Sequence, residues 1–181
     1  MAIQNEEVAH AELVNGGETT LHSHAGGGSV DFKPYKVYDS TGEQALDSGT
    51  VVINLDSELI SNANYSLASD EITINEAGLY QISYTTAITQ SDTSGGTRSM
   101  QNFWMESDDS GSYSEIIGSF IAIYSRETCI DENGGNNATF LFEQTQASKK
   151  LRIRSVSPLQ TGTHTKTLAN RTSVSIIKIG E

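Results

Sequence analysis

The sequence predicts an all-β sandwich, and three observations support this fold class. The 181 residues include 16 Gly and only 2 Pro. Ser, Thr and Asn interrupt the chain roughly every ten residues, which is typical of short strands joined by turns. Several segments alternate apolar and polar side chains with a period of two, and no long stretch has apolar residues at helical spacing. We therefore expect eight or more strands, enough for two packed sheets.

Residues 72–88 show this alternation most clearly. Ile72 and Ile74 alternate with polar residues, and every second residue from 80 to 88 is aromatic, aliphatic or Thr. Between the two runs lies Glu76-Ala77-Gly78, where glycine supplies the backbone freedom that a tight corner needs. The segment predicts two half-buried strands joined as a hairpin.

Two later segments are apolar on both faces, namely residues 100–106 and residues 116–124. A strand of this kind is central in its sheet or covered by a neighbour. A single sandwich needs only one apolar face per strand, so the surplus predicts a face buried between subunits. Packing three copies around an axis would bury it, so we expect a homotrimer. The expected interface residues are Tyr80, Tyr84, Phe103, Phe120 and Tyr124.

The first 30 residues form a separate attachment arm in this interpretation, followed by a body over residues 31–181. The arm ends in three consecutive glycines, Gly26 to Gly28. It holds too little apolar surface to order alone, so it docks on a partner or stays mobile. The residues expected to make the attachment are Val8, Leu13, Val14 and Leu21.

The formal charge of -12 argues against nucleic acid as a partner, because an acidic surface repels phosphates. The sequence at the N-terminus has no basic region followed by an apolar core, so we expect no signal peptide, no membrane span and synthesis in a cytoplasm. Cys129 is the only cysteine, so no disulfide within the chain is expected.

The sequence predicts no enzymatic activity. It contains no G-x-S-x-G, no phosphate-binding loop and no H-E-x-x-H. His10 and His164 have no Ser or Cys at a recognisable spacing, although spacing alone leaves an assembled triad open. Acidic turns at Asp108-Asp109 and Asp131-Glu132 are candidates for calcium or simply solvated turns.

The run AGLYQISY after an acidic turn resembles the central strands of C1q/TNF-like jelly rolls, and the last strand, TSVSIIKI, resembles the closing strand of that family. The resemblance implies a jelly roll over residues 31–181. It also implies that the last strand lies in the middle of the inner sheet and that three copies associate.

The segment AELVNGGETTLHSHAGGG is similar to segments of tail-fibre and other virion-surface proteins of tailed bacteriophages. Together the two resemblances imply a structural protein at the virion surface: a trimeric capsid decoration or head-fibre protein held by its arm. The alternative is a receptor-binding tail-fibre tip that recognises host-surface glycans. For sugar stacking the candidates are Trp104, Tyr113 and Tyr124; strand positions favour packing roles for Trp104 and Tyr124, and Tyr113 stays open.

His22 and His24 lie two residues apart, so both imidazoles face one side of an extended segment. Three chains on an axis would bring six nitrogens together, which suits iron or another octahedral transition metal. Some phage fibre tips that this segment resembles bind iron in that way. The alternative is a solvated linker without metal; no other cofactor is expected.

Overall fold

The computed structural model of the protein describes residues 33–47, 49–90, 98–126, 132–161 and 165–180. The chain divides into two units, Met1–Val30 and Asp31–Glu181. The described residues form strands in two antiparallel sheets and no helix, which confirms the predicted all-β sandwich. None of them belongs to a helix that could span a membrane.

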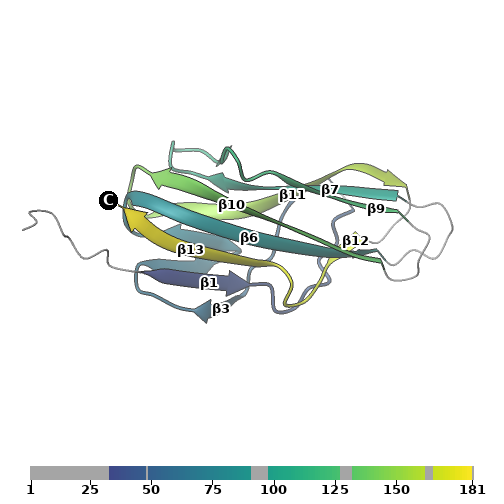
Figure 1. The fold of residues 1–181 in the computed structure, drawn as a ribbon, viewed down its shortest axis with the longest axis horizontal. Coiled ribbons are helices and arrows are strands. Elements are labelled where there is room, and N and C mark those ends of the chain that lie inside the picture. The colour runs from purple at the N-terminus through teal and green to yellow at the C-terminus, as the bar shows by residue number, and fades with distance from the viewer. Residues whose placement is uncertain (1–32, 48, 91–97, 127–131, 162–164, 181) are drawn as a thin grey trace, which may run out of the picture. The chain divides into compact units, whose positions relative to one another are not determined.

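Sheet A has the strand order β10-β6-β13-β1-β3, and β12 pairs with the end of β6 (Figure 1). Its strands are β1 (Pro34–Tyr38), β3 (Ser57–Ile60), β6 (Gly78–Gln90), β10 (Glu132–Gln144), β12 (Thr165–Thr167) and β13 (Ser173–Gly180). The last strand therefore lies between β6 and β1, in the middle of the sheet, as the resemblance implied. Ile82 of β6 is opposite Phe140 on one side and Ile176 on the other.

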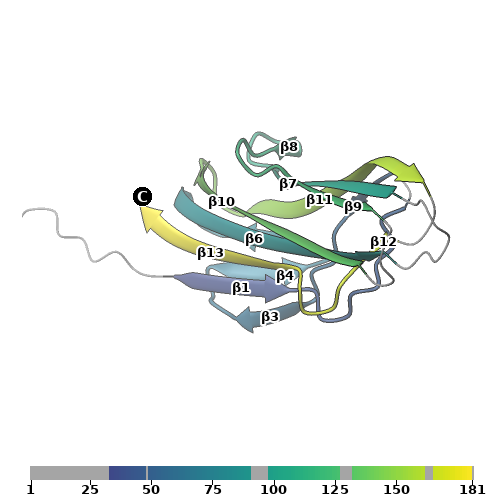
Figure 2. The same cartoon turned by 45° about the vertical axis from the view of Figure 1, so that its right-hand side comes forward.

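Sheet B has the order β4-β5-β11-β7-β8, with β2 paired to β11 and β9 paired to β7. Its strands are β2 (Thr50–Val52), β4 (Tyr65–Ala68), β5 (Glu71–Ile74), β7 (Arg98–Ser107), β8 (Ser114–Glu115), β9 (Ile121–Arg126) and β11 (Lys149–Thr161). Figure 2 shows β7, β8 and β11 as a second layer over β6 and β13.

The core lies between the two sheets and is filled by the inward side chain of every second residue. Tyr35 of sheet A stacks on Tyr65 of sheet B with ring centroids 4.8 Å apart and an interplanar angle of 13°. Tyr84 of sheet A meets Phe140 edge to face at 6.4 Å, and its hydroxyl donates a hydrogen bond to the carbonyl oxygen of Ser119. Aromatic side chains thus fill much of the space between the two sheets.

The predicted trimer interface is wrong for three of its five residues, because these three belong to the core. Tyr80, Tyr84 and Phe103 are fully buried inside one chain. A side chain that has already lost its accessible surface on folding adds none to a contact between subunits. Phe120 and Tyr124, by contrast, are 51% and 55% exposed.

Residues 72–88 do not form a hairpin. β5 pairs within sheet B and β6 within sheet A, so the corner at Glu76 to Gly78 carries the chain from one layer to the other. Both strands keep the predicted alternation, because every second side chain of each strand points into the core that lies between the two sheets. Gly78 has φ 147°, a backbone conformation that favours glycine.

Residues 116–124 are likewise not one strand. A turn closed by the bond from Ser119 N to Ile116 O, 3.1 Å long, precedes β9, which begins at Ile121. Gly118 has φ 86° in this turn. Because a left-handed glycine ends the extended run, Ile117 and Phe120 leave the sheet and face outward.

Candidate functional site

The predicted metal and attachment residues lie outside the described residues. These are His22 and His24 for the metal, and Val8, Leu13, Val14 and Leu21 for the attachment. Cys129, His10 and His164 lie outside them as well. Within the described ranges no group of three or more His, Cys, Asp or Glu side chains is arranged to hold a metal ion.

The acidic turn at Asp108 and Asp109 joins two loops. The Asp109 carboxylate accepts hydrogen bonds from Thr145 Oγ1 at 2.6 Å and from the backbone N of Thr145 and Gln146 at 3.0 to 3.1 Å. Asp108 Oδ1 accepts one from Lys150 N at 2.6 Å. These carboxylates tie the turn after β7 to the turn before β11, so their oxygens are already employed in structural contacts.

One edge of sheet A carries an apolar surface that stays exposed among the described residues. Leu141 on the edge strand β10 is 60% exposed, and Ile117 in the turn before β9 is 93% exposed. Both line a surface hollow of about 310 Å³ whose other lining residues include Asp109, Glu115 and Glu143. We call Ile117, Leu141 and these three acids the β10 patch. It combines exposed apolar side chains with negative charge.

The opposite edge of sheet A carries a second such surface. Leu59 on the edge strand β3 is 63% exposed. It lines a hollow of about 290 Å³ together with Lys36, Tyr38, Asn170 and Ser173. We call these five residues the β3 patch. Its charged residue, Lys36, has the sign opposite to the acids of the β10 patch.

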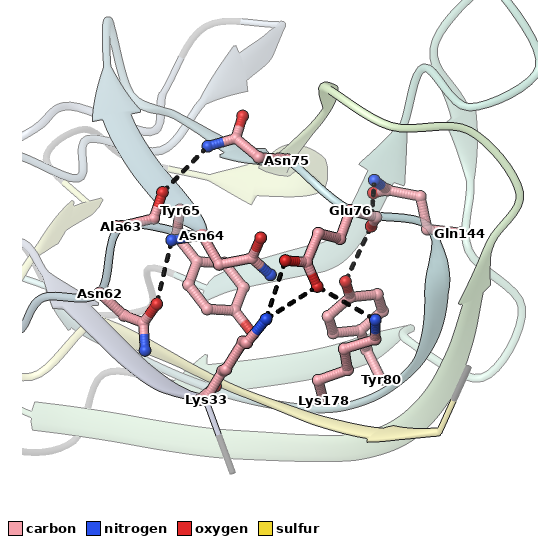
Figure 3. Close-up of polar contacts among 10 residues, drawn as sticks. All are labelled: Lys33, Asn62, Ala63, Asn64, Tyr65, Asn75, Glu76, Tyr80, Gln144 and Lys178. Atoms are coloured by element: carbon pink, nitrogen blue, oxygen red, sulfur yellow. Dashed lines mark hydrogen bonds and ion pairs between the residues drawn. The ribbon is translucent and has the colours of Figure 1, made fainter. Parts of the chain in front are cut away.

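The corner at Glu76 is locked by charges from two other segments (Figure 3). Lys33 Nζ lies 2.8 and 3.0 Å from the two carboxylate oxygens of Glu76, and Lys178 Nζ lies 3.1 Å from one of them. Hydrogen bonds from Lys33 and then Lys178 hold the pKa of Glu76 below its usual value. The backbone O of Glu76 also accepts a hydrogen bond from Tyr80, 2.8 Å long.

Gln144 completes this corner by donating from Nε2 to Ile74 O at 2.8 Å and to Glu76 O at 3.1 Å. It thereby ties the end of β10 to the crossing between the sheets. Gln144 Oε1 and Asn64 Nδ2 are buried here without a hydrogen-bond partner in the described chain. The cluster fixes where β1, β6, β10 and β13 meet. We assign it a structural role.

The outer face of sheet B carries a network of charged and aromatic side chains. Arg152 Nε and Nη2 lie 2.9 and 2.8 Å from Glu106 Oε2, and its guanidinium lies 3.5 Å from the centroid of the Tyr113 ring. The Tyr113 hydroxyl donates to Glu71 Oε1 at 2.6 Å. Burial would raise the pKa of Glu71, but hydrogen bonds from Lys150 and Tyr113 outweigh it and lower the pKa.

Trp104 belongs to this outer face and not to the core. Its strand partners Phe103 and Met105 point inward, whereas Trp104 is half-buried on the outer side with Nε1 donating to Glu106 Oε1 at 3.1 Å. The sequence pattern left core and interface packing open for Trp104, because both faces of the strand are apolar. Tyr124 lies on the same outer face in β9, opposite Met100. Tyr113 has one ring face covered by Arg152.

No protein-family model and no curated protein matches the chain. Solved structures do match: crystal structures of murine APRIL at pH 8.0 and pH 5.0 cover 82% of this chain and 100% of their own. Their TM-scores are 0.53 and 0.55 at 7% and 5% sequence identity. At this identity the likeness concerns the fold alone. The chain therefore has the jelly-roll sandwich of the C1q/TNF-like kind, with the closing strand in the middle of sheet A.

Proposed function

We propose that the protein is a non-enzymatic structural protein at the surface of a tailed-bacteriophage virion, a trimeric capsid decoration or head-fibre protein held by residues 1–30. The viral setting rests on the resemblance of residues 11–28 to virion-surface segments. The trimer rests on a structural observation, the two unpartnered patches on opposite edges of sheet A. A non-enzymatic role accords with the absence of catalytic motifs from the sequence.

The two patches fit each other better than either fits itself. Pairing two β10 patches would bring Asp109, Glu115 and Glu143 of one copy against the same acids of the other. Pairing the β10 patch of one copy with the β3 patch of the next places Ile117 and Leu141 against Leu59, and the acids near Lys36. Opposite charges in such contacts favour the correct register.

A contact between two different surfaces is heterologous, so each copy leaves one patch free until the assembly closes into a ring. Three copies form the smallest such ring that is not a dimer. Of the predicted interface residues, Phe120 remains a candidate because it is exposed and follows Ile117 in the same turn. Tyr124 is exposed on the outer face of sheet B and takes no part in the proposed contact between subunits.

The experiment has two parts. Light scattering on the purified full chain at micromolar concentration should give the mass of three 19.5 kDa chains. Deletion of residues 1–28 should then leave a folded trimer that no longer associates with virus particles. A monomer mass would refute the trimer, and a deleted chain that still binds particles would refute the tethering role of the arm.

The second candidate function is a receptor-binding tip that recognises host-surface glycans. The half-buried Trp104 on the outer face of sheet B favours it, because an aromatic ring at the surface can stack on the C–H face of a sugar. Copy number on the particle separates the two roles. Decoration proteins are numerous on the shell, whereas fibre tips are few.

A further inference from the structure

We propose that the outer face of sheet B around Trp104 binds a saccharide that carries a carboxylate, such as a uronic acid unit. Three groups define the site: the Trp104 indole, the Arg154 guanidinium and the Asn102 side-chain amide. The proposal deepens the second candidate function, since it names the site and the class of sugar. It does not depend on the trimer, since none of these three residues belongs to either patch.

The strand register brings these three groups together. Trp104 of β7 is directly opposite Arg154 of β11, and Asn102 is opposite Val156. Directly opposite residues on one face have Cβ atoms about 5 Å apart. Residues two apart along a strand are separated by about 7 Å. The indole, the guanidinium and the amide therefore lie within the span of one or two sugar rings.

Arg154 has one hydrogen-bond donor that the described residues leave without a partner. Its Nε is buried without a hydrogen-bond partner among the described residues, and the nearest carboxylate oxygen, Glu106 Oε1, is 3.7 Å away. Arg152, two residues earlier, has already taken Glu106 at hydrogen-bond distance. The Arg154 side chain stays 23% exposed. Because Nε itself is buried, a ligand carboxylate would meet the part of the Arg154 side chain that is still exposed, and there supply a closer pairing than Glu106 does.

Asn102 adds an acceptor two residues before Trp104 on β7. Its Oδ1 is buried and has no hydrogen-bond partner within the described chain. Unpaired buried polar atoms are costly, so a buried donor on β11 and a buried acceptor on β7, both next to Trp104, call for a common explanation. Sugar hydroxyls both donate and accept hydrogen bonds, and the C–H face of a sugar ring suits the indole.

Arg154, and not a local excess of positive charge, selects an anionic sugar over a neutral one. The chain as a whole has a formal charge of -12. Yet β11 places Lys150, Arg152 and Arg154 at successive outward positions, because Leu151, Ile153 and Ser155 between them point into the core. The carboxylates in their ion pairs are those of Glu71 and Glu106. Asp108 lies near Lys150, and Glu115 is opposite Glu106 in the strand register, so acids match the three basic side chains of β11. The preference for a carboxylate therefore rests on Arg154, whose ion pair with Glu106 is 3.7 Å long.

The indole is held ready for such a ligand. Its Nε1 donates to Glu106, and Glu106 is itself held by Arg152. Because the orientation of the indole is fixed before binding, the protein loses little side-chain entropy when a ligand binds.

Trp104 is the only tryptophan of the chain, so its fluorescence reports on the site directly. We would titrate the full chain with trigalacturonic acid and with the neutral maltotriose. We expect a saturable change in emission with trigalacturonic acid, and at least about tenfold weaker binding of maltotriose, which has no carboxylate to pair with Arg154. Arg154→Gln should weaken trigalacturonic acid binding at least about tenfold. Arg154→Lys should weaken it by less, since lysine keeps the positive charge but lacks the planar guanidinium that can make two hydrogen bonds to one carboxylate.

Lys166→Gln is the matched control, because it removes one positive charge from sheet A, where Lys166 pairs with Glu43 at 2.7 Å. It should leave binding unchanged. Circular dichroism and the ligand-free emission of each variant establish that it is folded. The proposal is overturned if trigalacturonic acid gives no saturable change, if maltotriose binds equally well, or if folded Arg154→Gln binds like the parent. The mass of the assembly is measured separately, so a failure here leaves the trimer standing.

Discussion

Ile117 and its neighbour Ile116 offer the sharpest test of the proposed assembly. The two side chains have the same size and adjacent positions, but Ile117 is 93% exposed and Ile116 is 8% exposed. If the β10 patch packs on the next copy, Ile117 loses its exposure only in the trimer. Ile117→Ser should then weaken association while leaving the free energy of unfolding of a single chain unchanged.

The magnitude follows from the area that Ile117 would bury. Complete burial of an isoleucine side chain stabilises by about 2 kcal/mol, so three contacts contribute about 6 kcal/mol per trimer. At 1.4 kcal/mol per factor of ten, the trimer dissociation constant rises by about 10⁴. Because that constant scales with the square of concentration, the midpoint of dissociation shifts about 100-fold toward higher protein concentration.

Sedimentation equilibrium over a dilution series measures this midpoint, and urea unfolding at low concentration measures the stability of one chain. Ile116→Ala is the matched control, and it should cost about 2 to 5 kcal/mol of folding stability because it opens a cavity in the core. An unchanged midpoint for Ile117→Ser would refute the proposed contact. So would a loss of single-chain stability as large as that of Ile116→Ala.

Two further predictions concern the body itself. Gly78→Ala should destabilise the fold by at least about 2 kcal/mol in urea unfolding, because an added Cβ would lie 2.6 Å from Lys178 Cε and 2.7 Å from Gly180 O; Gly111→Ala, at φ 94° with nothing within 4 Å, carries the backbone strain alone and should cost less. Acid should also destabilise the fold, since the pKa of Glu71, of Glu76 and of Asp109 lies below the ordinary value, which is 4.5 for Glu and 3.8 for Asp. The unfolded chain binds these protons more readily, so the stability they contribute is present above those values and is lost as the pH falls through the folded-state pKa values. A urea midpoint that stays the same when the pH is lowered from about 7 to about 3 would contradict this assignment.

The strands could be predicted from the sequence because alternation is a local signal. Residues 80–88 point inward at every second position, as the pattern required. The assignment of strands to sheets could not be predicted from it. An alternating strand has the same pattern whether its neighbour in sequence pairs beside it or faces it across the core, so β5 and β6 looked like a hairpin.

The candidate sites depend on partners that are distant in sequence. Lys33 and Lys178 reach Glu76 across 43 and 102 residues, and no spacing rule connects them. Part of the outer face of sheet B could be predicted from the sequence. Arg152 and Arg154 alternate with Leu151 and Ile153, so their outward direction follows from the pattern. Trp104 was expected to pack in the core or at an interface, because a strand that is apolar on both faces does not reveal which face is inside.

The position of β13 has a consequence for biosynthesis. Sheet A needs β13 between β6 and β1, yet the ribosome makes β1 and β6 long before it reaches residue 173. Until then the flanks of β1 and β6 that β13 will cover stay unpaired, and open strand flanks invite aggregation. The nascent chain thus has to wait for a distant segment before its central layer can close, which predicts slow folding and a need for chaperones during translation.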